Sequence, residues 1–374
     1  MQFSEIEFDE FKTYLNDNNS YFINRLGGSD IAAYFSRYRN NNNPNIEEII
    51  TLLSISNGYY DISKHQNNRK ENLELFFNKL MSIYQNNLIN SNACNAVNYI
   101  NSVNPTIMPN IKYNNQKYIC YHHQIETIYH FIKNILPIYE NKTVLIVCPF
   151  VENIKTQIPK LDKLYRFNFP KINFIFLQTY ITYYNENDNT YLNTPHNNFS
   201  ETVEFYKNEI ENLDFDVAFL SCGSYAHFIG EHIKTIGKKA IYMGSILQIY
   251  FGVFGDDAML REDYILSIFN VEHCIFNSYN NMNYGKNTAE SLNRYTLNEY
   301  KYVDKLNQFD YNKYYVQTNT LLSETSAKIH FIMSSKSNKF ANLPEGFDAQ
   351  EYKKSNNLNI SNIDALMHYV NTSL

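Results

Sequence analysis

Short apolar runs alternate with segments of helical periodicity over the first two thirds of the chain. The runs are predicted as strands: Tyr21–Asn24, Thr143–Pro149, Asn173–Gln178, Asp216–Ser221 and Lys239–Met243. Apolar runs without polar alternation are typical of strands that a parallel sheet buries on both faces. Helices are predicted between and after them, at Ile31–Arg39, Glu152–Tyr165, Ser200–Leu213, Tyr225–Ile236 and briefly from Ser245. The alternation predicts an α/β fold with a Rossmann-like, mostly parallel sheet flanked by helices.

The ends of the predicted elements and the remaining segments suggest how the chain is divided. Ser200 is predicted as a helix N-cap, and Gly237 stands where a C′ glycine belongs. The N-terminal portion up to about residue 115 is predicted as largely helical. We therefore expect a Rossmann-like domain over residues 1–275 with a helical insertion at about 40–120, and a C-terminal extension of unknown role over 276–374.

Asparagine is so frequent that its absence is informative. The chain holds 56 Asn in 374 residues, together with 33 Tyr, 26 Phe and no Trp. Such a composition fits drift towards AT-rich codons. Residues 213–269 nevertheless contain no Asn, and they hold six of the eleven glycines. Because drift towards a polar residue is resisted where packing or chemistry forbids it, this block is predicted to form core and site.

Charge and hydropathy exclude several classes of protein. The net charge of −6 provides no basic field for nucleic acid. The N-terminus lacks the pattern of a signal peptide, and the longest charge-free apolar stretch, Ala240–Gly255, is shorter than the roughly 20 residues of a membrane span. The five cysteines show no close pair, which argues against a zinc site or a disulfide framework. We expect a cytoplasmic protein without a membrane span, and the aromatic surplus favours a homodimer.

The turns that follow the predicted strands are the candidate site. Ligands of parallel α/β sheets bind beyond the carboxyl ends of the strands, and phosphates favour the N-termini of helices. The candidate ligand-binding residues in these turns are Arg25, Gly27, Gly28, Pro149, Phe150, Ser221, Gly223, Ser224, Tyr225, Gly244 and Gln248. Arg25 would supply a positive fork for a diphosphate, and the glycines would let a ligand approach the backbone. For any single turn, a glycine that merely permits a tight turn explains the sequence equally well.

The known nucleotide-binding and catalytic motifs are incomplete or absent in this sequence. The segment Gly223–Gly230 lacks the middle glycine of G-x-G-x-x-G, and neither a P-loop nor a G-x-S-x-G nucleophile elbow occurs. His122, His123 and Glu126 have spacing that suggests metal ligation, but helix-end residues of ordinary role are the commoner interpretation. Asp30 follows two glycines at a predicted helix start, where it either caps the helix or faces a ligand.

Three segments resemble the GT-D type glycosyltransferases and related bacterial polysaccharide-biosynthesis proteins. They are INRLGGSD at Ile23–Asp30, VLIVCPFVENIKTQ at Val144–Gln157, and the stretch Phe215–Gly255 that contains GKKAIYMGSILQIYFG. The resemblance implies transfer of a sugar from a nucleotide-sugar donor, such as UDP-GlcNAc or UDP-Glc, to a glycan or glycoprotein acceptor.

The same resemblance suggests roles for individual residues. The family's best described branch holds a metal through Asp-x-Glu, whereas Gly28-Ser29-Asp30 stands at that place here. Asp30 is therefore the expected ligand of a Mn²⁺ or Mg²⁺ ion, with only one of the two carboxylates present. Asp30 or Glu126 would act as the catalytic base for the acceptor hydroxyl, and Tyr225 or Gln248 would hold the base or the sugar.

Two alternatives remain open. The incomplete Asp-x-Glu motif is compatible with a non-catalytic nucleotide-sugar-binding or scaffold protein of glycan assembly. Generic topology alone would also suit an oxidoreductase or another Rossmann enzyme.

Overall fold

The structure is a computed structural model of the 374-residue chain. It describes residues 4–5, 8–25, 46–62, 66–90, 117–119, 132, 135–165, 167–182, 184–185, 190–191, 194–254, 269, 273–276, 348–360 and 362–373. The chain divides into two compact units. The first is residues 1–155, 170–250 and 281–285; the second is 156–169, 251–280 and 286–374. The predicted boundary at residue 275 falls inside the second unit.

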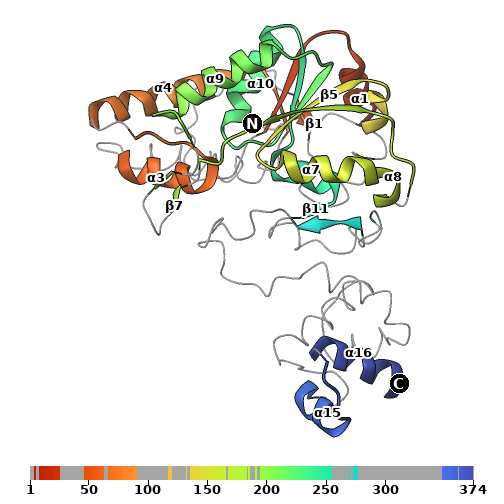
Figure 1. The fold of residues 1–374 in the computed structure, drawn as a ribbon. Coiled ribbons are helices and arrows are strands. Elements are labelled where there is room, and N and C mark those ends of the chain that lie inside the picture. The colour runs from red at the N-terminus through yellow and green to blue at the C-terminus, as the bar shows by residue number, and fades with distance from the viewer. Residues whose placement is uncertain are drawn as a thin grey trace. The chain divides into compact units, whose positions relative to one another are not determined.

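One parallel sheet organises the first unit (Figure 1). Its strands lie in the order β1-β4-β3-β2-β10-β9-β5-β6, and every pairing between them is parallel. Their bounds are β1 Ser4–Glu5, β2 Tyr21–Arg25, β3 Leu88–Asn90, β4 Lys117–Ile119, β5 Thr143–Cys148, β6 Asn173–Gln178, β9 Val217–Leu220 and β10 Lys239–Tyr242. The predicted α/β fold with a parallel sheet is confirmed.

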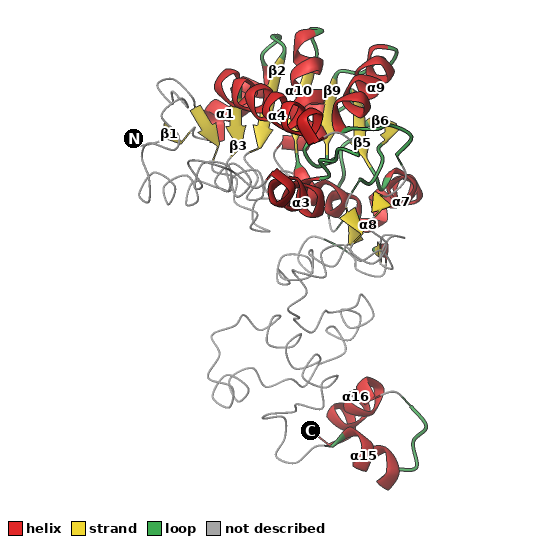
Figure 2. Cartoon of the chain, turned by 90° about the vertical axis from the view of Figure 1, so that its left-hand side faces the viewer, coloured by secondary structure: helices red, strands yellow, loops and turns green. Residues whose placement is uncertain are grey.

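Helices cover both faces of this sheet. On one face lie α4 Gln66–Asn86, α9 Phe199–Glu211 and α10 Tyr225–Thr235, and the views in Figures 1 and 2 agree on this grouping. Helix α7 Val151–Gln157 follows β5 in the chain and lies on the opposite face of the sheet. The other helices that the structure describes before residue 254 are α1 Phe8–Asn16, α3 Ile46–Asn57, η2 Leu136–Tyr139, η3 Ile158–Lys160, α8 Leu161–Leu164 and η4 Gly244–Phe251.

Alternate residues of β5 pack into different layers of the core. Leu145 and Val147 of β5 pack with α3, α4, α9 and α10 in one large cluster of buried side chains. Val144 and Ile146, which are also fully buried, face the other way. Both faces of the central strands are therefore removed from water, as the unbroken apolar runs predicted.

The connections create a switch point between β5 and β9. The chain leaves β5 through α7 on one face of the sheet, whereas it leaves β9 through α10 on the other. In open parallel sheets the crevice outside such a point is where ligands bind. The adjacent turns at residues 149–150 and 221–224 therefore stand at the expected place.

Several predicted elements differ in detail from the structure. The helix predicted at Glu152–Tyr165 is split into α7, η3 and α8, because Pro159 removes a backbone donor and clashes with the preceding turn. Strand β6 is only partly buried, since it has one neighbour among the described strands. Strands β3 and β4 were not predicted. The predicted helix Ile31–Arg39 lies outside the described residues.

The N-cap of α9 is Asn198, and the prediction of Ser200 was wrong. The Asn198 Oδ1 accepts a hydrogen bond from the backbone N–H of Glu201 at 3.0 Å. The Glu201 carboxylate in turn accepts from the Asn198 amide at 2.9 Å and from the backbone N–H of Asn197 at 2.9 Å. This reciprocal arrangement is a variant of the capping box, in which the Glu201 carboxylate reaches the backbone N–H of Asn197 and the side chain of Asn198 instead of the backbone N–H of the N-cap residue.

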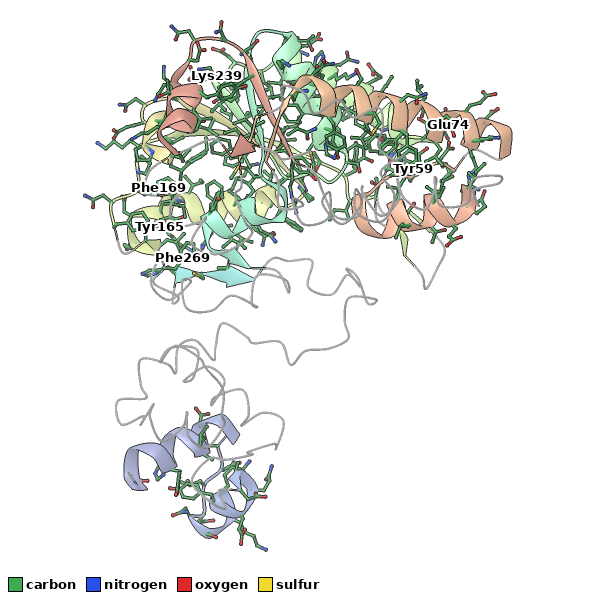
Figure 3. The ribbon with its side chains drawn as sticks, turned by 180° about the vertical axis from the view of Figure 1, so that it is seen from behind. Tyr59, Glu74, Tyr165, Phe169, Lys239 and Phe269 are labelled. Carbon is green, nitrogen blue, oxygen red and sulfur yellow. The ribbon has the colours of Figure 1, made fainter. Side chains whose placement is uncertain are left out.

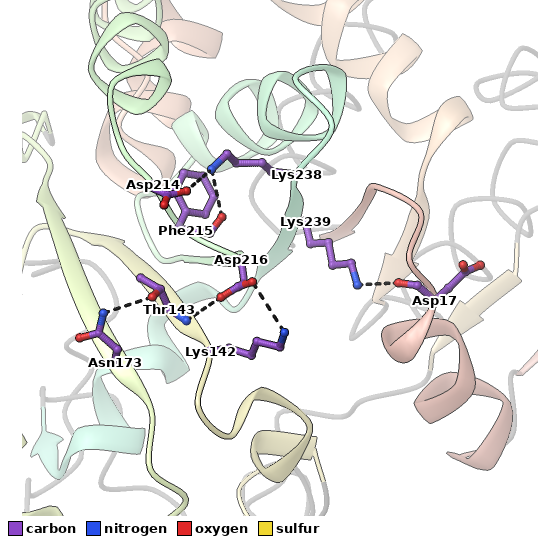
Figure 4. A network of polar contacts seen from close by, with 9 residues as sticks. All are labelled: Asp17, Lys142, Thr143, Asn173, Asp214, Phe215, Asp216, Lys238 and Lys239. Carbon is purple, nitrogen blue, oxygen red and sulfur yellow. Dashed lines mark hydrogen bonds and ion pairs between the residues drawn. The ribbon is translucent and has the colours of Figure 1, made fainter.

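Polar contacts close the amino-terminal edge of the sheet (Figure 4). The Asp216 carboxylate accepts from the backbone N–H of Thr143 at 2.7 Å, and Lys142 Nζ lies 3.9 Å from it. Lys239 donates to the backbone carbonyl of Asp17 at 2.5 Å, and Lys238 lies over the ring of Phe215. These contacts hold the starts of β5, β9 and β10 at the edge opposite the candidate site.

The second unit contains an aromatic cluster and two C-terminal helices. Tyr165 contacts the rings of Phe167, Phe169 and Phe269 at centroid distances of 5.2, 5.0 and 5.1 Å, and Figure 3 shows Tyr165, Phe169 and Phe269 together. Gln157 donates to the backbone carbonyl of His273 at 2.7 Å. The C-terminal helices are α15 Ala349–Ser355 and α16 Asn362–Ser373, which pack on each other. The small strand pairs are β11 Val253–Phe254 with β12 Ile275–Phe276 here, and β7 Tyr184–Asn185 with β8 Thr190–Tyr191 in the first unit.

Candidate functional site

The guanidinium of Arg25 reaches from the end of β2 to the turn that follows β10. Gly244 has a backbone φ of +66°, and a Cβ placed there would overlap Arg25 Nη1 and lie 2.8 Å from its Cζ. The guanidinium also lies over the Tyr242 ring, 5.8 Å from its centroid. Glycine at position 244 thus provides both the left-handed turn and the space that Arg25 fills.

The strands β2 and β10 stop pairing just before this contact. Their register ends at Ile23 and Ile241, two residues before Arg25, while β2 continues to pair with β3. The backbone N–H of Arg25 donates to the Oδ1 of Asn24 at 2.8 Å. The edge of the sheet therefore opens between the ends of β2 and β10, with Arg25 on one side and Gly244 on the other.

Asn24 is a fully buried polar residue that the sequence pattern did not single out. Its Oδ1 also lies 2.7 Å from Nδ1 of His227, which is equally buried in α10. Since Oδ1 can only accept, His227 carries its proton on Nδ1. The ring of His227 packs edge-on against Tyr84 and Tyr242. Asn24 therefore connects α10 to the strand end from which Arg25 projects.

The turn after β9 lies where it was predicted, between β9 and α10. Gly223 has a φ of +60°, and Ser221 and Ser224 are buried. Ser224 precedes α10, but its hydroxyl does not cap the helix. Tyr225 points into the core: its ring stacks on Phe199 at 4.6 Å, and burial raises the pKa of its phenol. The contacts of Tyr225 favour a structural role, and its role in ligand binding stays a prediction.

Two of the remaining described candidates lie at the switch point, and the third lies in the segment after β10. Pro149 and Phe150 are buried in the turn between β5 and α7, and Gln248 is buried in η4. Burial raises the pKa of the neighbouring Cys148 thiol to about 12, so this thiol is a packing group rather than a nucleophile.

Four candidate residues, Gly27, Gly28, Asp30 and Glu126, lie outside the described residues, together with the His122-His123 pair. Within the part of the chain that the structure describes, no group of three His, Cys, Asp or Glu is arranged to hold a metal ion. In the same part, every helix is too short or too polar to cross a membrane. The metal-binding role of Asp30 and the base roles of Asp30 and Glu126 stay predictions.

Comparison of the chain with protein-family models, with curated proteins and with solved structures found no match in any of the three. The chemistry of the site therefore rests on its own geometry. That geometry is a guanidinium and two left-handed glycine turns on the carboxyl ends of adjacent parallel strands, which is an arrangement suited to an anionic ligand.

Proposed function

We propose that the protein is a glycosyltransferase that uses a UDP-sugar, with its diphosphate bound between Arg25 and the turns at Gly244 and Gly223. The observation that carries the proposal is the position of Arg25 against Gly244, at the point where β2 and β10 separate. The resemblance of Ile23–Asp30 and Phe215–Gly255 to GT-D type enzymes supports the choice of donor. The proposed acceptor is a glycan or glycoprotein.

The spacing of the strands suits a ligand of this length. The ends of β2, β10, β9 and β5 are consecutive, so three strand spacings separate the first from the last. At about 4.8 Å each, they cover on the order of 14 Å, comparable with an extended nucleotide sugar. In the proposed complex the diphosphate lies towards β2 and the nucleoside lies towards the switch point.

The proposed chemistry requires stabilisation of a leaving diphosphate. As the bond from the anomeric carbon to the diphosphate oxygen breaks, negative charge accumulates on UDP. A guanidinium held in place before the reaction stabilises that charge without having to reorganise. If Asp30 binds a divalent cation, that cation would supply further positive charge to the same group.

Thermal-shift measurements test the proposal directly. UDP, UDP-glucose, UDP-N-acetylglucosamine, GDP, CMP and NAD would each be added with and without Mn²⁺. A UDP ligand well above its dissociation constant should raise Tm by a few degrees. Arg25→Ala should abolish this shift and Arg25→Lys should reduce it. The control Arg69→Ala, which removes a pair with Glu47 on α3, should leave the shift unchanged.

The possible outcomes separate the alternatives. A shift with UDP but not with GDP or CMP supports the proposed donor class, whereas a shift with NAD alone supports an oxidoreductase. UDP-sugar binding without consumption of any tested donor supports the non-catalytic alternative. A UDP shift of equal size in Arg25→Ala contradicts the assigned diphosphate site.

A further inference from the structure

Helix α10 connects two parts of the proposed diphosphate site that the sheet keeps apart. The helix begins after the turn at Gly223, which follows β9, whereas Arg25 ends β2, and β10 lies between these two strands. Helix α10 nevertheless packs directly on β2 (Figure 2). The contact includes a hydrogen bond between His227, in the first turn of α10, and Asn24 of β2. The turn at Gly223 and the strand end at Arg25 are therefore linked through one side-chain pair.

The hydrogen bonds of Asn24 have one consistent direction. The backbone N–H of Arg25 donates to Oδ1 of Asn24 at 2.8 Å, so the amide oxygen, and not the amide nitrogen, faces that N–H. The same Oδ1 lies 2.7 Å from Nδ1 of His227, which must therefore donate. Asn24 and His227 are both 0% exposed, so neither side chain is open to a ligand. An effect of either one on ligand binding has to pass through Arg25.

A second contact connects His227 with the guanidinium of Arg25. The ring of His227 packs edge-on against the ring of Tyr242 in β10, with 5.1 Å between the centroids and 85° between the ring planes. The Cζ of Arg25 lies 5.8 Å from the centroid of the same Tyr242 ring. An aromatic face within about 6 Å attracts a guanidinium. His227 thus supports the backbone of Arg25 through Asn24 and its guanidinium through Tyr242.

We infer that His227, Asn24 and Tyr242 are positioning residues that hold the Arg25 guanidinium ready for the diphosphate of the donor. The inference rests on the proposed function. A guanidinium that is already oriented loses less conformational freedom when the ligand binds, so more of its attraction for the diphosphate appears as affinity. The link to α10 also keeps Arg25 in a fixed relation to the turn at Gly223.

The binding of UDP and of uridine to the full chain separates positioning from folding. Uridine lacks the diphosphate, so the ratio of the two dissociation constants, measured by ligand-observed NMR, reports what the diphosphate contributes. His227→Phe keeps a ring against Tyr242 but loses the hydrogen bond to Asn24. It should weaken UDP binding about 10-fold, the effect of about one net hydrogen bond, and leave uridine binding unchanged.

Two further variants complete the series. His227→Leu loses both the hydrogen bond and the aromatic contact, so it should weaken UDP binding more than His227→Phe and again leave uridine binding unchanged. Ile233→Ala is the matched control, because Ile233 is a fully buried residue further along α10. It should destabilise the helix packing without changing the ratio of UDP to uridine affinity.

Nitrogen NMR of wild-type protein labelled at histidine provides a test that needs no variant. Neutral His227 should carry its proton on Nδ1, because Asn24 Oδ1 can only accept. Protonation of the neutral ring at Nε2 would leave Nδ1 unable to donate to Asn24 and would overturn the inference.

The failures of the two proposals are distinguishable. If the wild type binds UDP and both His227 variants keep its ratio of UDP to uridine affinity, the positioning role is overturned and the UDP site is retained. A ratio that falls equally in Ile233→Ala would show a general effect of destabilising α10, which also overturns the positioning role. If the wild type binds neither UDP nor a UDP-sugar, the proposed function fails, and with it the role of His227.

Discussion

Arg25 fills the space that a side chain at position 244 would need. The two residues stand 219 positions apart in the sequence, at the ends of neighbouring strands, and the left-handed backbone of Gly244 brings them together. Replacing Gly244 by Ala therefore has two separable effects: strain in the backbone and displacement of the guanidinium.

Gly237→Ala is the matched control for Gly244→Ala. Gly237 has a φ of +82°, but a Cβ there would meet no atom within 4 Å. Both substitutions should lower the free energy of unfolding by about 1 kcal/mol through the backbone alone. Only Gly244→Ala should also remove the thermal shift produced by UDP. Equal UDP shifts in the two variants would contradict the importance of the Arg25–Gly244 contact for binding.

Removing the Asn24 side chain should destabilise the fold and disorganise the strand end. Asn24→Ala leaves the His227 Nδ1–H and the Arg25 backbone N–H without their buried acceptor, at a cost of about 2–3 kcal/mol in urea unfolding. Combining it with His227→Phe in a double-mutant cycle should reveal a coupling energy of about 1 kcal/mol or more. Additive effects would mean that the two side chains act independently.

Gly230 permits close packing of α10 on β2. A Cβ at this position would overlap the ring of Phe22, which is itself buried. Gly230→Ala should therefore destabilise the protein by about 1–3 kcal/mol, although alanine is the better helix former. Adding Phe22→Leu should restore part of the loss, because the smaller side chain leaves room for the methyl group. Thermal unfolding of the two single variants and the double variant would measure this compensation.

Two substitutions in and beside α9 should change the free energy of unfolding in opposite directions. Asn198→Ala removes the acceptor for the Glu201 N–H and should cost about 1 kcal/mol. Asn208→Ala, on the exposed side of the same helix, should instead stabilise by a few tenths of a kcal/mol through helix propensity. Urea unfolding would detect both. Equal changes in the two variants would argue against Asn198 as the cap.

Buried tyrosines predict the behaviour of the protein in alkali. Burial raises the phenol pKa of Tyr21, Tyr139, Tyr206 and Tyr225 above the ordinary value of 10.0. Their contribution to stability is complete below pH 10 and is lost as the pH rises towards the folded-state values, because the unfolded chain ionises first. Tyrosine absorbance should therefore show a late, cooperative ionisation that coincides with unfolding. Ionisation of all tyrosines near pH 10 in folded protein would contradict this.

The local pattern of apolar residues was sufficient to predict much of the sheet. The runs at Thr143–Pro149, Asn173–Gln178 and Lys239–Met243 match β5, β6 and β10 to within a residue. In β5 and β10 the reason is burial on both faces, which leaves an unbroken apolar signal. The strands β3 and β4 have three residues each and carry too little pattern to be found. The prediction of one helix after β5 followed the helical spacing of the apolar residues and overlooked Pro159. Proline lacks a backbone N–H, so the helix is split there.

The candidate site was predictable only where it depends on turns. Glycines with positive φ at 223 and 244 follow from strand–turn–helix geometry. The pairing of Asn24 with His227 joins residues 203 positions apart, and the contact of Arg25 with Gly244 joins residues 219 positions apart. Such contacts arise from tertiary packing, which leaves no periodic trace in the sequence.

The capping box at Asn198 has a consequence for any comparison with relatives of different base composition. Mutational bias supplies asparagine throughout this chain, yet at position 198 the requirement is only a short acceptor that reaches a backbone N–H. Ser or Thr would meet it, whereas Asp would place a second carboxylate against Glu201, so a relative from a GC-rich genome is expected to exchange this residue among Asn, Ser and Thr. Position 24 is different, because a fully buried carboxylate would add an uncompensated charge. Asparagine should therefore persist at position 24 in genomes where the codon bias no longer favours it.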